Sequence, residues 1–265
     1  MGVPLRIVDA FTDTAFAGNP AAVCVLERPG DAAWMQRVAV EMNLSETVFL
    51  TREGDGWGIR WFTPGTEVDL CGHATLAAAH ALWERGEAPA DRPIGFTSRS
   101  GPLSAARDGD GWITLDFPAQ PAHEQPVPPA LSASLQGAVW FGSNGHKMLA
   151  VLRDESAVRG FLPDRDAILA SGNEGLIVAA RGDGADFVSR FFAPAVGIDE
   201  DPVCGSAHCL LGPDWAGVLG KNELSAQQVS PRGGALRVTV AGDRVKIAGR
   251  AVTTLVGELT DAAAG

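Results

Sequence analysis

The chain has 265 residues, of which 46% are hydrophobic and 20% charged, a balance typical of a globular protein rather than a disordered or fibrous one. Its 32 acidic residues outnumber its 21 lysines and arginines, and the formal net charge of −11 disfavours nucleic acid and anionic membrane surfaces as partners. The apolar runs are far shorter than the roughly 20 residues that a membrane span needs, and the N-terminus lacks the pattern of a secretory signal. We therefore expect a cytoplasmic protein with no membrane partner.

Short β-branched or aromatic runs bounded by Gly, Pro or Asp predict strands in the first part of the chain. They cover residues 5–11, 21–26, 47–50, 58–62 and 112–117. Alanine-rich or periodic segments at 32–42 and 75–85 predict helices, and the second is apolar nearly all round. This second helix should therefore be buried.

Five prolines lie between residues 118 and 129, where no helical periodicity is present. This composition predicts a linker at 119–129 that joins an N-terminal lobe, residues 1–118, to a C-terminal lobe, residues 130–245. Whether a strand from 246–260 returns to complete the N-terminal lobe stays open at this level.

The second part of the chain repeats the strand pattern of the first. Strands are predicted at 137–141, 147–152, 175–180 and 186–192, followed by a helix from about residue 205. Residues 234–260 predict two further strands around the turn Gly242-Asp243.

Local motifs recur in the same order in both halves, which predicts an internal duplication. Arg60-Trp-Phe-Thr-Pro64 returns as Arg190-Phe-Phe-Ala-Pro194, and Cys71-Gly-His-Ala74 returns as Cys204-Gly-Ser-Ala207. Weaker echoes relate Asn19 to Asn144 and the motif ending at Glu46 to the one ending at Glu174.

The two Cys-Gly motifs each form a loop that runs into an apolar helical stretch. A helix start has unpaired N–H groups and a partial positive charge, so these two starts are candidates for holding a carboxylate and for activating Cys71 and Cys204. The alternative is two ordinary tight turns with buried thiols. Cys24, Cys71, Cys204 and Cys209 are too few for a disulfide scaffold in a chain of this length.

Glu46 stands two residues before the apolar run Val48-Phe-Leu50. A partly buried carboxylate in such a place is a candidate general acid/base. The alternative is a surface residue or a partner of the preceding helix end.

Six ordered motifs together resemble the phenazine-biosynthesis PhzF-type proteins of the diaminopimelate-epimerase-like superfamily. They are Val8-Asp-Ala-Phe-Thr12, Gly18-Asn-Pro-Ala-Ala-Val23, Asn43-Leu-Ser-Glu-Thr47, Arg60-Trp-Phe-Thr-Pro64, Glu67-Val-Asp-Leu-Cys-Gly-His-Ala-Thr75 and Glu200-Asp-Pro-Val-Cys-Gly-Ser-Ala-His-Cys209. The resemblance implies an α+β fold of two similar lobes, each a β-barrel-like sheet around a central helix. It also implies an active site in the cleft between the lobes, a small carboxylate-bearing substrate, no cofactor or metal, and a homodimer.

The resemblance assigns roles to individual residues. Glu46 matches the glutamate that moves a proton within the substrate, and His73 and Asp201 match residues that bind and polarise it. The substrate-binding residues expected around them are Gly72, Gly205, Ser206 and Asn19.

One departure from the family pattern concerns the residue before the second Gly-Ser-Ala, which is commonly threonine and here is Cys204. In related epimerases and proline racemases, thiols matching Cys71 and Cys204 exchange a proton across opposite faces of an amino acid. A two-thiol racemase is therefore the alternative to a Glu46-dependent isomerase, and a non-catalytic small-molecule binding protein is a second alternative.

A zinc site built from the ligand types of these motifs is a further possibility. Its residues would be Cys71, His73, Cys204, His208 and Cys209. His208 and Cys209 fall about one helical turn beyond Cys204, where core packing is the simpler interpretation. We therefore predict no metal.

Overall fold

The computed structural model describes residues 2–89 and 91–260, which form two compact units. Unit 1 contains the chain up to Asp116 together with the C-terminal segment from Ala248, and unit 2 contains Phe117–Ile247. No helix in the described ranges is long and apolar enough to cross a membrane.

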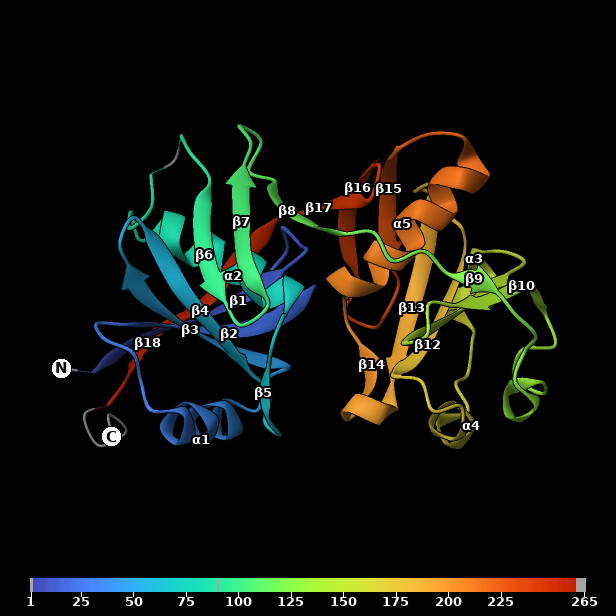
Figure 1. The fold of residues 1–265 in the computed structure, drawn as a ribbon, viewed down its shortest axis with the longest axis horizontal. Coiled ribbons are helices and arrows are strands. Elements are labelled where there is room, and N and C mark those ends of the chain that lie inside the picture. The colour runs from blue at the N-terminus through green and yellow to red at the C-terminus, as the bar shows by residue number, and fades with distance from the viewer. Residues whose placement is uncertain (1, 90, 261–265) are drawn as a thin grey trace. The chain divides into compact units, whose positions relative to one another are not determined.

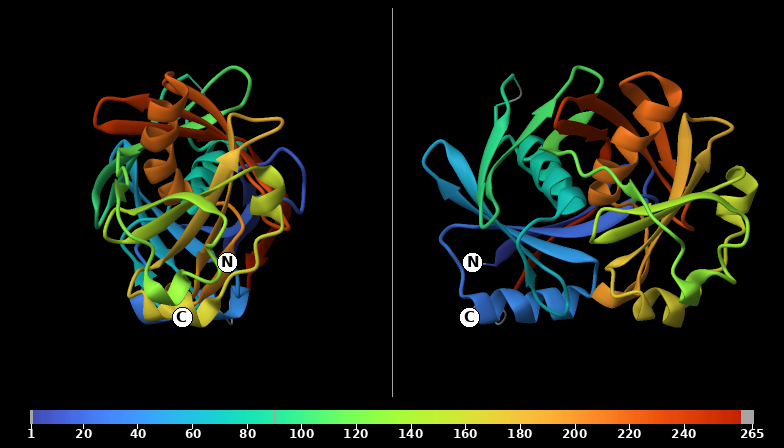
Figure 2. Two further views of the ribbon diagram at one scale, coloured as in Figure 1. Left: turned by 90° about the vertical axis from the view of Figure 1, so that its right-hand side faces the viewer. Right: turned by 45° about the vertical axis from the view of Figure 1, so that its right-hand side comes forward.

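Unit 1 is built from strands around one central helix (Figure 1). Its elements are β1 (Val3–Ala10), β2 (Asn19–Leu26), α1 (Ala32–Met42), β3 (Glu46–Glu53), β4 (Gly56–Phe62), β5 (Glu67–Val68), α2 (Gly72–Glu84), β6 (Ile94–Ser98), β7 (Gly101–Arg107), β8 (Ile113–Pro118) and β18 (Ala251–Leu259). α2 is buried along nearly its whole length and packs against β1, β2, β3 and β18, as its apolar sequence predicts. Figure 2 shows it among these strands.

Unit 2 repeats this plan with one long helix. Its elements are β9 (His123–Glu124), η1 (Pro129–Leu131), β10 (Ala138–Ser143), β11 (Lys147–Leu152), α3 (Glu155–Arg159), α4 (Arg165–Ala170), β12 (Gly175–Arg181), β13 (Phe187–Ala193), η2 (Pro194–Val196), β14 (Ile198–Asp201), α5 (Gly205–Leu219), β15 (Glu223–Gln228), β16 (Gly234–Ala241) and β17 (Arg244–Gly249). β9 lies in the segment 119–129 that the prolines predict to be a linker, and η1 begins at its last residue.

Strand pairing follows the same order in both units. In unit 1, β1–β2 is antiparallel, β2–β3 parallel, β3–β4 antiparallel, β4–β6 parallel and β6–β7 antiparallel. In unit 2, β10–β11, β11–β12, β12–β13, β13–β15 and β15–β16 have the same directions in the same order. This agreement supports the α+β fold with internal duplication that the sequence motifs predict.

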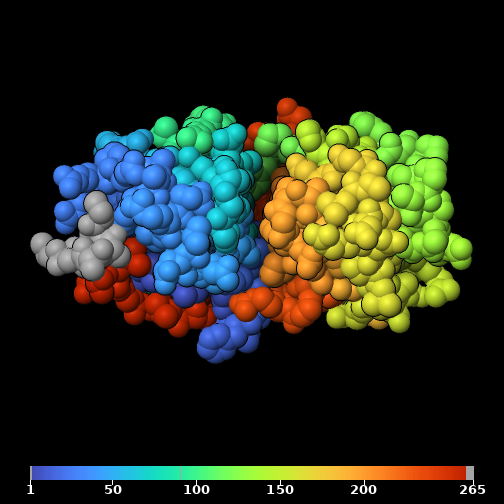
Figure 3. All heavy atoms as spheres, turned by 90° about the horizontal axis from the view of Figure 1, so that it is seen from below, coloured from blue at the N-terminus to red at the C-terminus, as the bar shows by residue number. Residues whose placement is uncertain are grey.

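The last strand of the chain belongs to the first unit. β18 pairs antiparallel with β1 along its whole length, while the short β9 pairs with β10. β18, drawn in red, lies at the surface of unit 1, and residues of α1, in mid-blue, cover one end of that unit (Figure 3). The strand pattern left open whether a strand from 246–260 returns to the N-terminal lobe, and the pairing of β18 with β1 shows that it does.

Each predicted strand and helix has a counterpart, but several observed elements were not predicted, among them β6, β7, α3, α4 and β15. Two predicted segments also differ from the structure. α2 begins at Gly72 rather than residue 75, because the Cys-Gly motif is itself the helix start. Residues 234–260 contain three strands, not two, although the predicted turn at Gly242-Asp243 does separate β16 from β17. Only Arg250 separates β17 from β18, so the sequence offers no turn signal at that boundary.

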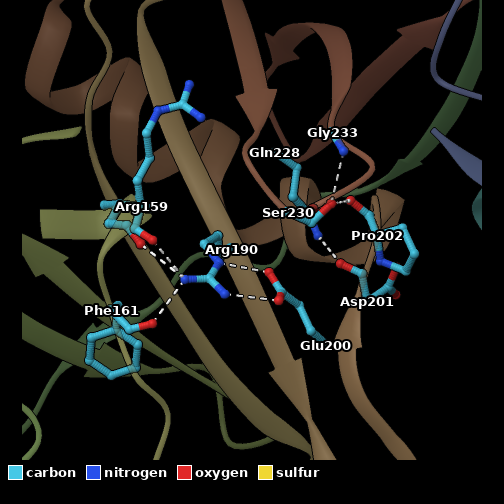
Figure 4. Close-up of polar contacts among 10 residues, drawn as sticks. Arg159, Phe161, Arg190, Glu200, Asp201, Pro202, Gln228, Ser230 and Gly233 are labelled. Atoms are coloured by element: carbon cyan, nitrogen blue, oxygen red, sulfur yellow. Dashed lines mark hydrogen bonds and ion pairs between the residues drawn. The ribbon is translucent and has the colours of Figure 1, made fainter. Parts of the chain in front are cut away.

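A bidentate arginine–glutamate pair recurs in both units directly before the Cys-Gly helix. Arg60 Nε and Nη2 donate to the Glu67 carboxylate at 2.7 and 2.8 Å, and Arg190 donates to Glu200 at 2.7 and 2.9 Å (Figure 4). The guanidinium of Arg190 also donates to the backbone oxygens of Arg159 and Phe161 at 3.2 and 2.9 Å. Each pair ties a central strand to the chain that leads into the buried helix.

We expect Arg190→Met to lower the free energy of unfolding by about 2–4 kcal/mol, because it leaves Glu200 without its guanidinium partner and removes a donor from three backbone oxygens, those of Val158, Arg159 and Phe161. Arg60→Met is the matched control, since Glu67 keeps Arg99 Nη2 at 2.8 Å and the loss should be about 1 kcal/mol. Urea unfolding followed by tryptophan fluorescence measures both, and equal losses would contradict the argument.

Candidate functional site

Glu46 is the first residue of β3 and is only 8% exposed. The chain leaves α1 at Asn43, which adopts a left-handed conformation (φ 49°, ψ 38°), and then enters the strand. β3 runs parallel to β2 with Ala21 opposite Glu46, so the beginnings of both strands meet. This pairing brings Glu46 close to Asn19, the first residue of β2.

His73 lies in the first turn of α2 and is 5% exposed. Its Nε2 lies 3.0 Å from Glu46 Oε2, and its Nδ1 lies 3.5 Å from Cys71 Sγ. Cys71 is the N-cap of α2, with extended backbone and no side-chain capping bond. The structure therefore brings three of the predicted catalytic residues of unit 1 together.

Asn19 is fully buried beside this group. Its Nδ2 lies 3.3 Å from His73 Nδ1, and its Oδ1 accepts a hydrogen bond from Ser45 Oγ at 3.1 Å. Ser45 belongs to the Asn-Leu-Ser-Glu motif, but no feature of the motif singled out this serine as a functional residue. The parallel pairing of β2 with β3 is what places it against Asn19.

The electrostatics of the group favour a positive ring beside a neutral thiol. Burial by itself lowers the pKa of His73, but Cys71 and Glu46, through charge and hydrogen bonding, raise that pKa well above the usual histidine value. Burial and the charge of Glu46 raise the pKa of the Cys71 thiol. At neutral pH Cys71 is therefore a thiol rather than a thiolate.

Glu46, Cys71 and His73 each carry a donor atom of a type that binds metals, and these atoms lie within 4.8 Å of one another. The His73 ring, however, presents a different nitrogen to each partner, with Nε2 toward Glu46 and Nδ1 toward Cys71. A metal ion needs one ring nitrogen directed at the same point as the carboxylate and the thiol. The arrangement fits a hydrogen-bonded network better than a coordination site.

The matching helix start in unit 2 is held by a buried glutamine. The side chain of Gln228 accepts from Cys204 N at 3.0 Å and donates to Asp201 O at 2.5 Å. The Asp201 carboxylate accepts from Val203 N at 3.1 Å, and Ser230 Oγ donates to Pro202 O (Figure 4). Asp201, Cys204 and Gly205 are buried, whereas Ser206 is exposed.

The two helix starts differ in their chemistry. Cys204 Sγ lies 3.2 Å from Ser206 Oγ, and burial is the main cause that raises the pKa of this thiol. The parallel pair β11–β12 of unit 2 corresponds to the parallel pair β2–β3 of unit 1. Gly175 is the first residue of β12, as Glu46 is the first residue of β3, so unit 2 has no carboxylate at the position of Glu46. The sequence comparison that matched Glu46 with Glu174 is therefore wrong by one residue. Glu174 instead forms an ion pair with Lys147, with an N···O distance of 2.6 Å.

His208 and Cys209 belong to the core of unit 2. His208 Nδ1 lies 2.7 Å from Cys204 O and Cys209 Sγ 3.7 Å from Gly205 O, both one turn back along α5. The His208 ring also packs near Phe187, which stacks on Trp215. These contacts agree with core packing rather than with metal ligation.

Gln228 is a buried residue of the site region that sequence reasoning missed. It lies in β15, far along the chain from Asp201 and Cys204, and no motif marks it. Its place follows from the parallel pairing of β15 with β13.

The architecture of two duplicated strand units around buried helices defines the class of protein to which this chain belongs. A solved PhzF-family structure from Enterococcus faecalis is similar over 98% of this chain and 100% of its own, with a TM-score of 0.94 and 45% identity. A probable proline racemase from Agrobacterium radiobacter shares the fold, with a TM-score of 0.64 and 12% identity over 98% of this chain and 93% of its own. The class is thus the PhzF and epimerase-like α+β fold.

Within that class, the chain belongs to the phenazine biosynthesis-like PhzF family. The PhzC-PhzF model, described as phenazine biosynthesis-like protein, matches residues 8–257. An uncharacterized isomerase of Halalkalibacterium halodurans is 49% identical over 263 residues, covering 98% of this chain and 99% of its own. Another, from Pseudomonas aeruginosa, is 50% identical over 261 residues with the same coverage.

The buried His208 predicts an acid-sensitive core. Burial lowers the pKa of His208 from 6.5 to about 4. The neutral, buried ring therefore contributes to the free energy of unfolding above pH 6.5, and this contribution is lost as the pH falls through about 4. The loss between pH 7.5 and 4.5 is roughly 2–3 kcal/mol. We expect His208→Gln to reduce by this amount the stability difference between pH 7.5 and 4.5. Urea unfolding at both pH values measures it, and the exposed His146→Gln variant should behave like the unmodified protein.

Proposed function

We propose that this protein is a cofactor-independent isomerase that moves a proton within a small carboxylate-bearing metabolite, with Glu46 as the general acid/base. The observation that carries the proposal is the buried Glu46 carboxylate, 3.0 Å from His73 at the start of α2. The relatives named as isomerases support the reaction class.

In the proposed reaction, the Glu46 carboxylate removes a proton from a carbon of the substrate. The electron pair of the broken C–H bond moves into the conjugated system of the substrate. The Glu46 carboxyl proton exchanges with solvent, and Glu46 then delivers a proton to a second carbon on the same face, so the double bond migrates and no atom is gained or lost. A single positioned acid/base that performs both transfers needs no external proton carrier.

His73 has two roles in this proposal. It lies beside Glu46 and orients the carboxylate, and its polar N–H stabilises the negative charge that develops on the substrate when the proton is removed. In a buried site such a dipole acts at a low effective dielectric constant and is stronger than in water.

The second helix start supplies substrate binding in this proposal. Backbone N–H groups of Gly72, Gly205 and Ser206, at the starts of α2 and α5, are assigned to the substrate carboxylate, and Asp201 to its polar groups. Helix starts favour anions because their first N–H groups lack partners within the helix. That both starts serve one substrate stays a prediction from the family resemblance.

The two-thiol racemase is the less favoured alternative. It requires a thiolate, whereas burial raises the pKa of both Cys71 and Cys204. The Glu46 route requires no thiolate. The fold shared with a probable proline racemase does not decide between them, because fold similarity at 12% identity carries no information on the reaction.

The first experiment is deuterium uptake from D₂O, followed by mass spectrometry, with a panel of L- and D-amino acids, hydroxy acids and cyclic dienyl amino acids. We expect uptake that accompanies double-bond migration without inversion at the α-carbon. Inversion would favour the two-thiol route. A panel member that stabilises the fold without exchange would favour a binding protein.

Glu46→Gln should reduce turnover of the panel substrate by about 10²–10⁴-fold, the usual contribution of a positioned acid/base. The matched control is Glu53→Gln, an exposed glutamate at the other end of β3, which should leave turnover unchanged. Steady-state rates with circular dichroism of both variants test this, and a well-folded Glu46→Gln protein with normal turnover would sink the assignment.

Cys204→Ser should retain most of the turnover, because the proposed proton path does not include this thiol. The same assay measures it. A loss comparable to that of Glu46→Gln, in a folded variant, would instead assign the chemistry to the thiols.

A further inference from the structure

We propose that Ser45 and Asn19 are positioning residues that keep the proton of the neutral His73 ring on Nε2, the nitrogen that faces Glu46. They form a relay of two hydrogen bonds, Ser45 Oγ to Asn19 Oδ1 at 3.1 Å and Asn19 Nδ2 to His73 Nδ1 at 3.3 Å. On the other side of the ring, His73 Nε2 lies 3.0 Å from Glu46 Oε2, close enough for an ion pair but without the geometry of a hydrogen bond. The kinetic part of this inference rests on the proposed function, whereas the protonation state does not.

The first link sets which end of the Asn19 amide faces the histidine. An asparagine amide has one end that only accepts hydrogen bonds and one that only donates them. In the structure the hydroxyl of Ser45 donates to Oδ1 and Nδ2 faces His73. The opposite orientation would require the hydroxyl to accept and His73 Nδ1 to carry a proton. Asn19 is fully buried at the start of β2, so solvent does not compete for either end.

The second link sets the tautomer of the ring. Asn19 Nδ2 is a donor, so His73 Nδ1 has to accept and carries no proton of its own. Cys71 Sγ, 3.5 Å from the same nitrogen, is a neutral thiol and acts as a second donor. With two donors at Nδ1, a neutral ring has its proton on Nε2, the nitrogen 3.0 Å from Glu46 Oε2.

The relay also sets what happens when the ring becomes charged. An imidazolium has a proton on Nδ1 as well, and that proton needs an acceptor. Asn19 can supply one only by turning its amide over, and Ser45 then has to accept rather than donate. A serine hydroxyl can do both, whereas an alanine can do neither. The titratable groups that act on His73 within the described chain are Glu46 of β3 and Cys71 at the start of α2.

The consequence for the proposed reaction is a fixed orientation of the acid/base. Nε2 carries a proton both in this neutral tautomer and in the charged ring that the raised pKa of His73 favours, and that nitrogen lies 3.0 Å from Glu46 Oε2. A contact of this kind can tighten into a hydrogen bond when substrate binds. Asn19 would then act through His73 instead of through contact with the substrate. Loss of the relay should cost about 10- to 100-fold in kcat, the range measured for hydrogen-bond partners behind functional histidines at metal sites.

The test is ¹⁵N NMR of the histidine rings in the whole protein without substrate, with His73 assigned by comparison with His73→Gln. Above the titration of His73, we expect Nδ1 to show the shift of an unprotonated nitrogen and Nε2 that of a protonated one. A neutral His73 with its proton on Nδ1 would overturn the proposal.

Asn19→Asp places an acceptor at Nδ1 and should raise the pKa of His73 by at least about 1 pH unit. Asn222→Asp, an exposed position in unit 2, is the control for the added charge and should leave this titration in place. An unchanged His73 titration in Asn19→Asp would also overturn the proposal.

Ser45 is tested by a pair of variants. Ser45→Ala should give a mixed tautomer and a lower kcat, and Ser45→Thr, which keeps the hydroxyl, should restore both. If Ser45→Ala keeps a single Nε2 proton, the serine has no part in the relay. A change in kcat without a change in the ring nitrogens would indicate a purely structural effect, and failure of Glu46→Gln to affect turnover would separately reject the proposed function.

Discussion

Unit 1 depends on one constraint: the polar start of α2 is buried, so its polar groups have to satisfy each other. Unpaired buried polar groups cost several kcal/mol, and the structure avoids part of this cost through the hydrogen bonds of His73 with Asn19 and of Asn19 with Ser45, while Glu46 Oε2 lies at ion-pair distance, 3.0 Å, from His73 Nε2. The same contacts hold a carboxylate and an imidazole in a fixed mutual orientation. Stability and chemistry therefore rest on the same few side chains, and changes to them are best judged by a measurement of each.

The two units show how a duplicated plan acquires a single acid/base. Both have the same order of strand pairing, the same bidentate arginine–glutamate pair and the same Cys-Gly helix start. At the register position of Glu46, however, unit 2 has Gly175, and its nearby Glu174 is neutralised by Lys147. The framework repeats because strand pairing and core packing require it, while the residue suited to proton transfer is present in one unit alone.

The thiols illustrate how magnitudes decide between two opposing effects. A helix N-terminus stabilises an anion by about 0.3–1 kcal/mol, less than one pKa unit, whereas full burial shifts a pKa by up to about 3–5 units. Cys71 and Cys204 cap buried helices, and for both the desolvation effect is larger, so each remains a thiol. The motif alone suggested activated cysteines; their burial, which a motif does not reveal, reverses that expectation.

The sequence by itself determined the family, the duplication and the buried α2, because these depend on local periodicity and on motifs short enough to read along the chain. The same motifs named Glu46, His73 and Cys71 as candidates, together with Asp201 and Cys204, but only the structure brought the first three together. Tertiary structure alone decided the rest. β18 pairs with β1 across nearly the full length of the chain, Gln228 reaches the Cys204 loop, and Ser45 meets Asn19 through parallel pairing of β2 with β3. Each of these is a contact between distant segments whose partner is selected by strand register and burial, and neither quantity is encoded in the local pattern of residues.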